Sequence, residues 1–147
     1  MKILLLSVRS DFGGGPKHMH ELIQNIPQNI DVYAAFPDYC DPYSKLWNNN
    51  KRIKDYIHIP KQKFSYKAFK DLKCFVEKNK IDIIHSQGNG AGIYSRMLKM
   101  TGSNIKVIHS FHGVTPKYPT KLKEFIIPKL NKFLSKYTDV FIGASKS

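Results

Sequence analysis

The sequence lacks the features that mark membrane-spanning, secreted and metal-binding proteins. None of its apolar stretches approaches the ~20 residues that a membrane-spanning helix needs, and the opening run, MKILLLSV, is followed by Arg9 and Asp11 rather than by a signal-peptide cleavage site. Its two cysteines, Cys40 and Cys74, form neither a CxxC pair nor a disulfide framework, which is typical of a reducing compartment. We therefore expect a cytoplasmic protein whose first apolar run is a buried strand.

Arginine is scarce, although the chain is strongly basic. The formal net charge is +13, but only three of the 24 basic residues are arginines, namely Arg9, Arg52 and Arg96. Because bidentate recognition of phosphate and guanine edges favours arginine, we expect no specific nucleic-acid partner. The lysines remain suited to a polyanion or to an anionic membrane surface, or they reflect a compositional bias toward lysine, isoleucine and asparagine.

The hydrophobic pattern predicts one α/β domain over residues 1–147, in which short apolar runs alternate with amphipathic stretches. We predict strands over 3–8, 30–36, 56–59, 81–87, 105–111 and 139–145, and helices from Pro16 to Pro27, after a Ser65 cap, over 90–100 and over about 121–137. The stretch after the second strand, with Asp38, Pro42 and several asparagines, is expected to be a loop. This alternation is typical of a Rossmann-like doubly wound parallel sheet of about six strands, in the order 3-2-1-4-5-6, with helices on both faces.

Ligands of such sheets bind at the carboxyl ends of the first and fourth strands, where the winding reverses. Three consecutive glycines follow the first strand, HSQGNG ends the fourth and HSFHG ends the fifth. The glycine turn matches neither the dinucleotide fingerprint, since His18 stands at the third glycine position, nor the phosphate-loop motif. It is suited to a backbone cradle for a phosphate or a sugar hydroxyl at a helix N-terminus, or it serves only a tight strand-to-helix turn.

Three of the six histidines lie at the ends of the fourth and fifth strands. His85, Gln87 and His112 together indicate a polar site, whereas His109 alone is more typical of a packed, hydrogen-bonded histidine. Side chains two residues apart lie on different faces of a helix, so the HMH stretch at 18–20 does not predict a shared metal ion. We expect neither a metal nor another cofactor.

Several of these segments resemble the N-terminal domain of family 4 glycosyltransferases, which are retaining enzymes of the two-domain GT-B architecture. GGGPKHMHELIQNI resembles the Gly-Gly turn and first helix of that domain. KIDIIHSQGNGAGIYSRMLKMTGSNIKVIHSFHGV is similar to its strand with Asp and a terminal His, its small-residue helix with an Arg, and its strand ending in His-Gly. YTDVFIGASKS resembles the helix and strand that close the domain, so the resemblance covers nearly the whole chain.

The resemblance implies a domain that mainly binds the acceptor, a glycan or a lipid-linked sugar, in cell-surface polysaccharide synthesis. The sugar-nucleotide donor, a substrate rather than a cofactor, would bind mainly to a C-terminal domain. The signature of that domain, two glutamates separated by seven residues, is missing, because no two of Glu21, Glu77 and Glu124 are eight apart. We therefore expect an N-terminal half that binds the donor weakly by itself and works with a donor-binding domain in the same or a separate chain.

The same resemblance assigns roles to individual residues. His112 matches the cleft histidine near the reacting sugar and is the expected catalytic residue. The residues expected to line the cleft are Gly14, Gly15, His18, His85, Gln87, Asn89 and Gly113. Lys17 and Arg96 are candidate contacts for an acceptor phosphate, although a solvated surface position is the more usual role of each. Catalysis is expected to depend on positioning and on stabilising the departing diphosphate.

The segment KLKEFIIPKLNKFLSKY (121–137) combines an apolar stripe with five lysines. This pattern is more typical of a core-packing helix than of a membrane anchor, and Pro128 is expected to kink it. Because many of the resembled enzymes elongate lipid-linked sugars at the cytoplasmic leaflet, peripheral contact with anionic lipid also stays open.

Two other functions remain compatible with the sequence. A nucleotide-binding or oxidoreductase domain would share the fold, with Asp38 after the second strand as the contact to a ribose. A polyanion-binding module would use the lysines without the cleft, and its binding would fall steeply with salt.

Overall fold

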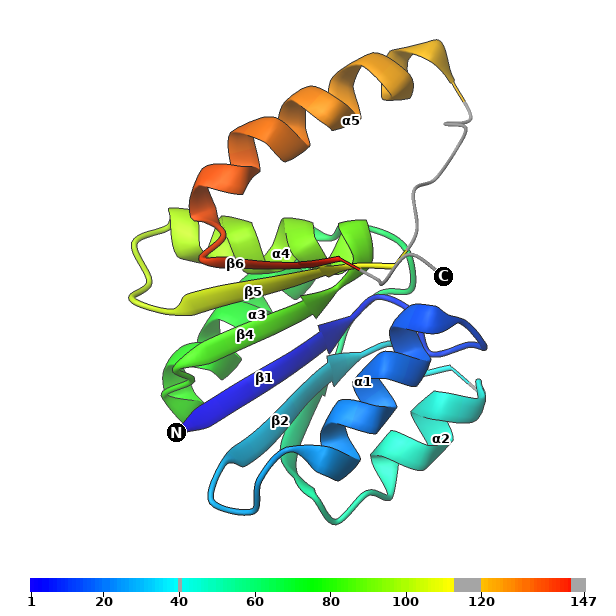
Figure 1. Cartoon of the computed structure of the whole chain (residues 1–147), viewed down its shortest axis with the longest axis vertical. Coiled ribbons are helices and arrows are strands. Elements are labelled where there is room, and N and C mark those ends of the chain that lie inside the picture. Colours follow the sequence, from blue (N-terminus) through cyan, green and yellow to red (C-terminus); the bar gives the residue numbers. More distant parts are fainter. Residues whose placement is uncertain (40, 113–119, 144–147) are drawn as a thin grey trace.

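The computed structural model of the chain describes residues 1–39, 41–112 and 120–143, and its centre is a parallel sheet (Figure 1). The strands are β1 (Lys2–Ser7), β2 (Asp31–Phe36), β3 (Ile53–His58), β4 (Ile83–Gln87), β5 (Lys106–Phe111) and β6 (Val140–Gly143). They lie in the order β3-β2-β1-β4-β5-β6. The predicted Rossmann-like fold is confirmed, and the winding reverses between β1 and β4.

Helices cover both faces of the sheet. They are α1 (Gly14–Asn25), α2 (Pro42–Asn48), α3 (Tyr66–Asn79), α4 (Gly88–Met100) and α5 (Lys121–Leu134), and a short 3-10 helix, η1 (Ser135–Tyr137), follows α5. Met19 and Ile23 of α1 pack on one face, whereas Leu72 of α3 and Leu98 of α4 pack on the other. All four of these side chains are fully buried, so two apolar layers enclose the sheet.

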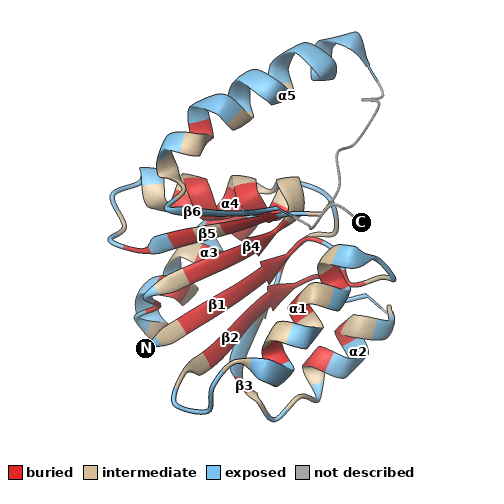
Figure 2. Ribbon diagram, in the orientation of Figure 1, coloured by how far each residue is buried: buried red, intermediate tan, exposed pale blue. Residues whose placement is uncertain are grey.

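β1 is buried from both sides, which explains its unbroken apolar sequence (Figure 2). Leu4 and Leu6 belong to the core under α3 and α4. Ile3 and Leu5 point to the opposite face and belong to the core under α1 and α2. Because successive side chains of a strand alternate between faces, only a strand covered on both faces requires apolar residues at every position.

α2 occupies the stretch that was expected to be a loop, so that prediction is wrong. Pro42 begins the helix after Asp41, in the position that proline favours. Trp47 is fully buried, stacks on Tyr43 at 5.6 Å between ring centroids and meets Phe36 of β2 edge-on at 5.2 Å. The burial of one large aromatic side chain therefore stabilises a helix that is too short for its periodicity to be recognised.

Local signals set the ends of two further helices. The Ser65 hydroxyl accepts a hydrogen bond from the Ala68 N–H at 3.3 Å, which confirms the predicted cap of α3. β4 passes directly into α4 at Gly88, earlier than the expected start at residue 90. Gly88 has a φ of +77°, which other residues adopt only with strain, so this abrupt strand-to-helix transition requires glycine.

α5 does not pack into the core, contrary to the more usual role of such an apolar stripe. Figures 1 and 2 show it apart from the sheet and mostly exposed. Leu122 and Phe125 are 68% and 63% exposed, and only Leu134 at its end is buried. The helix continues through Pro128. In the part of the chain that the structure describes, no helix is both long and apolar enough to cross a membrane.

Two histidines of neighbouring strands are buried on opposite faces of the sheet, His85 of β4 toward α1 and His109 of β5 toward α4. His85 contacts the Ser110 hydroxyl at 2.7 Å, and burial, together with two nearby histidines, lowers its pKa to about 4. His109 is fully buried and contacts the Ser86 hydroxyl at 2.9 Å, which confirms it as a packed, hydrogen-bonded histidine. Burial lowers the pKa of His109 to about 3, and the Arg96 guanidinium adds to this effect. Both rings are therefore neutral at pH 7.

Acid should destabilise this fold well before its carboxylates titrate. His85 and His109 take up protons in the unfolded chain below about pH 6.5, but in the folded chain only near their lowered pKa values of about 4 and about 3. The unfolded state therefore binds more protons between these values, and each histidine should remove about 2 kcal/mol of stability between pH 7 and pH 5. Urea unfolding at both pH values measures this loss. In a His109→Gln variant the loss should be about half as large, and an unchanged loss would contradict the assignment.

Gly92 should be intolerant of substitution because α4 lies directly against His109. A Cβ at this position would lie 2.5 Å from Cε1 of His109 and 2.6 Å from Nη2 of Arg96, which is closer than atoms can approach. Gly92→Ala should therefore lower the free energy of unfolding by about 1–2 kcal/mol, although alanine favours a helix. Urea denaturation measures the change. Gly143→Ala, where a Cβ meets nothing within 4 Å, is the matched control and should be neutral.

Candidate functional site

A cavity of about 310 Å³ opens at the carboxyl edge of the sheet, where the winding reverses. Its walls come from the ends of β1, β4 and β5 and from the first turns of α1 and α4. Of the residues expected in the cleft, those that line it are Gly14, Gly15, Gln87, Asn89 and His112. Gly113 lies outside the described residues. Sequence reasoning therefore found the position of the cavity and part of its wall.

The Gln87 side chain joins two histidines at the base of this cavity. Its Oε1 lies 3.0 Å from Nδ1 of His18 on α1 and 2.6 Å from Nε2 of His112 after β5. An amide oxygen only accepts hydrogen bonds, so both imidazoles donate to it. The Gln87 side chain is buried, with an exposed fraction of 4%, and its Nε2 has no partner among the described residues. One amide thus orients two imidazoles and keeps an unused N–H donor at the cavity.

His112 is held as a neutral ring, and one of its nitrogens has no hydrogen-bond partner among the described residues. Burial, with a contribution from His18, lowers the pKa of His112 below its ordinary value. Because its Nε2 donates to Gln87, its Nδ1 keeps a lone pair, and this edge of the ring faces Gly14. The ring can therefore accept a hydrogen bond from a hydroxyl group.

The glycine turn contacts His112 directly. A Cβ at Gly15 would lie 3.5 Å from Cδ2 of His112 and 3.9 Å from Cβ of Gln87. None of the glycines at 13–15 has a φ in the left-handed region, since the φ of 164° at Gly13 is extended backbone, so their conformation alone does not require glycine. What their small size provides is close approach between the first turn of α1 and the histidine, with the helix N–H groups near the cavity.

The remaining predicted residues lie away from the cavity wall. His85 is beneath it, in ring contact with His18 at 5.9 Å. The solvated position expected for Arg96 is wrong: this residue is 1% exposed, and its Nε donates to the Gly92 carbonyl at 2.7 Å. Lys17 is exposed on α1 and lies 3.9 Å from Glu21. In the described ranges, no group of three or more His, Cys, Asp or Glu side chains could hold a metal ion.

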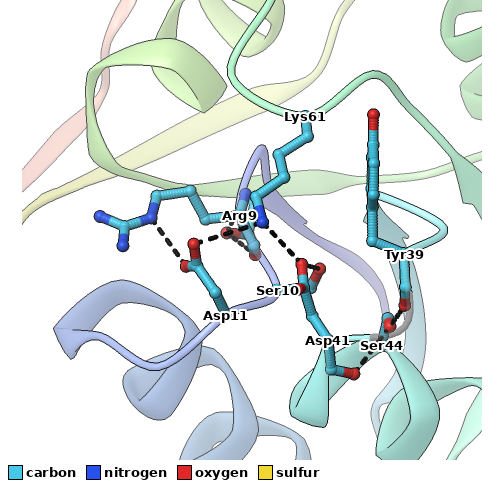
Figure 3. A network of polar contacts seen from close by, with 8 residues as sticks. Arg9, Ser10, Asp11, Tyr39, Asp41, Ser44 and Lys61 are labelled. Atoms are coloured by element: carbon cyan, nitrogen blue, oxygen red, sulfur yellow. Dashed lines mark hydrogen bonds and ion pairs between the residues drawn. The ribbon is translucent and has the colours of Figure 1, made fainter.

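An ion-pair network that the sequence analysis did not predict borders the cavity (Figure 3). Arg9 Nε donates to Asp11 at 2.9 Å, and Lys61 lies 3.4 Å from Asp11 and 2.9 Å from Asp41. The Ser10 hydroxyl also donates to Asp41. The hydrogen bond from Lys61 holds the pKa of Asp41 below its usual value, and Asp41 raises that of Lys61. The network ties the segment after β1 to the start of α2 and to the segment after β3.

Gln62 adds a residue from this last segment to the cavity wall. Its φ of 52° lies in the left-handed region, which is uncommon for a residue other than glycine. Its N–H donates to the Val8 carbonyl at 3.0 Å, which attaches the segment after β3 to the end of β1. Nothing in the local sequence predicts this pairing, because it joins residues far apart in the chain.

Solved structures with a similar fold include MurG, a glycosyltransferase and a dTDP-glucose dehydratase. MurG from Acinetobacter baumannii has a TM-score of 0.62 and 15% identity, and the match covers 99% of this chain and 42% of that one. A glycosyltransferase from Rickettsia africae ESF-5 has a TM-score of 0.55 and 17% identity over 99% of this chain and 43% of that one. dTDP-glucose 4,6-dehydratase from Bacillus anthracis str. Ames, in complex with NAD, has a TM-score of 0.60 and 9% identity, with 97% of this chain and 53% of that one covered. At these identities the likeness shows the fold alone.

The chain thus spans less than half the length of the MurG and Rickettsia proteins that it matches. No curated protein sequence matches it. The family model for glycosyltransferase family 4, however, matches residues 12–147, from the glycine turn through the last strand. The chain therefore belongs to glycosyltransferase family 4.

Proposed function

We propose that this domain binds the acceptor in the transfer of a sugar from a nucleotide-sugar donor, and that the cavity is the acceptor side of the cleft. One observation carries the proposal: Gly15 lies directly against the His112 ring, and Gln87 holds that ring by a hydrogen bond. Three segments from distant parts of the sequence supply these residues, and all three line one cavity. A glycan or lipid-linked sugar in cell-surface polysaccharide synthesis is the acceptor class that we propose.

His112 is the proposed catalytic residue, because its Nδ1, which has no partner in the described part of the chain, can accept a hydrogen bond from a sugar hydroxyl. In the transfer, the bond between the anomeric carbon and the donor diphosphate breaks, a bond to the acceptor hydroxyl forms, and the hydroxyl proton is released. A neutral imidazole can orient that hydroxyl as a hydrogen-bond acceptor. The N-terminus of α1 carries no side-chain cap and favours negative charge, which supports a role in stabilising the departing diphosphate.

The donor is proposed to bind mainly to a second domain, in the same or a separate chain. The matched MurG and Rickettsia proteins are more than twice as long as the segment that this chain covers in them. A nucleotide- or polyanion-binding module without transfer is the alternative. Asp38, its candidate ribose contact, is 3.7 Å from Nδ1 of His58. Tight NAD binding by the 147-residue chain would favour this alternative.

Substitutions in the cavity should abolish transfer without unfolding the domain. In the protein supplied with its donor-binding domain, His112→Ala should lower kcat/KM roughly 100-fold through loss of an oriented polar contact. Gly15→Val should do the same, because the added side chain would fill the space beside His112 and Gln87. His58→Ala, at the end of β3 and outside the cavity lining, is the matched control. Normal turnover by both cavity variants, with unchanged thermal midpoints, would contradict the proposed site.

We also propose that α5 contacts an anionic membrane surface. Leu122, Phe125, Ile126, Leu130 and Phe133 are all exposed. Five lysines lie in the same segment, at positions 121, 123, 129, 132 and 136. Exposed apolar side chains among cations suit the boundary between acyl chains and anionic headgroups.

Vesicle sedimentation tests this contact. The chain should bind vesicles of phosphatidylcholine with phosphatidylserine, and binding should weaken with salt and in vesicles without the anionic lipid. Phe125→Ser should weaken binding several-fold by removing buried apolar area, whereas Tyr66→Ser, at an exposed aromatic residue of α3, should not. Equal binding to neutral vesicles, or equal effects of the two variants, would contradict the proposal.

A further inference from the structure

Arg9 carries the only full charge among the described side chains that line the cavity. His112 also lines it, but its lowered pKa makes it neutral near pH 7. From the geometry around Arg9 we propose that the cavity holds an anionic group of the acceptor, a phosphate or a carboxylate, against this guanidinium. The assignment of this anion to the acceptor rests on the proposed function, whereas the anion site itself rests on the contacts of Arg9 and the two helix N-termini.

The Arg9 guanidinium lies against the start of α1. A Cβ at Gly13 would be 3.5 Å from its Nη2 and 3.8 Å from its Cζ, and Gly13 is the N-cap residue of the helix. A cation here faces the positive end of the helix dipole, which is unfavourable by itself. The first turn of α1 contains no acidic residue that would offset this repulsion. An anion between the guanidinium and the helix N–H groups would make this arrangement favourable.

A second set of donors faces the same cavity from α4. Its first turn, Gly88, Asn89 and Gly90, lines the cavity and has no side-chain cap. Gln87 just before it is 4% exposed, and its buried Nε2 has no partner among the described residues. An oxyanion accepts hydrogen bonds from such groups, and no carboxylate lines the cavity within the described part of the chain.

One acceptor atom in the wall indicates what else the ligand carries. Asn89 lines the cavity, and its buried Oδ1 has no partner in the described ranges. A buried amide oxygen is stabilised by a donor such as a sugar hydroxyl. The cavity therefore suits a ligand with both an anionic group and hydroxyl groups, such as a sugar phosphate or a uronic acid.

The ion-pair network holds Arg9 in position without occupying its outer nitrogens. Asp11 accepts from Nε, and within the described residues neither Nη makes a hydrogen bond. Figure 3 shows the Nη atoms directed away from Lys61 and Asp41. Lys61 and Arg9 share Asp11, which limits how far this carboxylate neutralises the guanidinium. Two parallel N–H donors thus remain for bidentate contact with a phosphate or carboxylate.

A titration of the 147-residue chain tests the proposal directly, with binding followed by amide NMR shifts. Glucose 6-phosphate and glucuronate serve as anionic ligands, glucose as the neutral ligand with the same ring, and UDP as a probe for a donor diphosphate. Arg9→Gln removes the guanidinium and Arg9→Lys keeps a point charge. Lys67→Gln removes a surface cation on α3 outside the cavity lining and is the matched control.

We expect at least one anionic sugar to bind about tenfold more tightly than glucose and to shift the amide signals of residues 13–15 and 88–90. Arg9→Gln should abolish this advantage, Arg9→Lys should keep part of it, and Lys67→Gln should not change it. Thermal midpoints should stay unchanged, because the Arg9 side chain is 46% exposed.

Several results would overturn the proposal. Equal binding of glucose and both anionic sugars, no binding of either anionic sugar at millimolar concentration, or unchanged binding by Arg9→Gln would each exclude an anion site at Arg9. Arg9-dependent binding of UDP alone would assign the anion to the donor. Weakening by Lys17→Gln rather than Arg9→Gln would move the site to the outer surface of α1.

The same variants separate this proposal from the proposed function. If glucose 6-phosphate binds through Arg9 but the protein with its donor domain shows no transfer, the anion site stands and the function fails. If transfer proceeds and Arg9→Gln leaves the kcat/KM of every acceptor unchanged, the function stands and the anion site fails.

Discussion

The site depends on the shared hydrogen bonds of one buried amide. Gln87 ends β4 and accepts from an imidazole on α1 and from another after β5, so it joins three segments that the chain brings together only through the sheet. Gly88 makes this possible, because its positive φ turns the chain into α4 without a loop and leaves the amide at the sheet edge. The abrupt transition and the position of the amide are therefore one structural feature.

Neutral histidines give this site its chemical character. Burial lowers the pKa of His85, His109 and His112, so in the described cavity lining positive charge comes from Arg9 and from the helix N-termini rather than from an imidazolium group. These sources do not change with pH in the neutral range. A site of this kind can combine fixed attraction for anions with hydrogen-bond acceptors for hydroxyl groups.

The sequence predicted most of the fold but only part of the site. Periodicity and glycine turns located the strands and four helices, because buried parallel strands such as β1 need apolar residues at every position. It missed α2, which depends on the burial of Trp47, and it missed Arg9 and Gln62, whose places are set by partners distant in sequence. The apolar stripe of α5 also led to the prediction of a core-packing helix, because the sequence pattern of an amphipathic helix does not identify the surface that its apolar side contacts.

The separation of α5 from the core has a consequence for how the molecule can vary. Both apolar layers around the sheet are built from β1 to β5 and α1 to α4, with Leu134 as the one buried side chain that α5 contributes. The outer surface of α5 can therefore accumulate substitutions at little cost to folding or to the geometry of the cavity. Under the proposed roles, membrane attachment through α5 and the choice of acceptor in the cavity can then evolve as two nearly independent properties of a single domain.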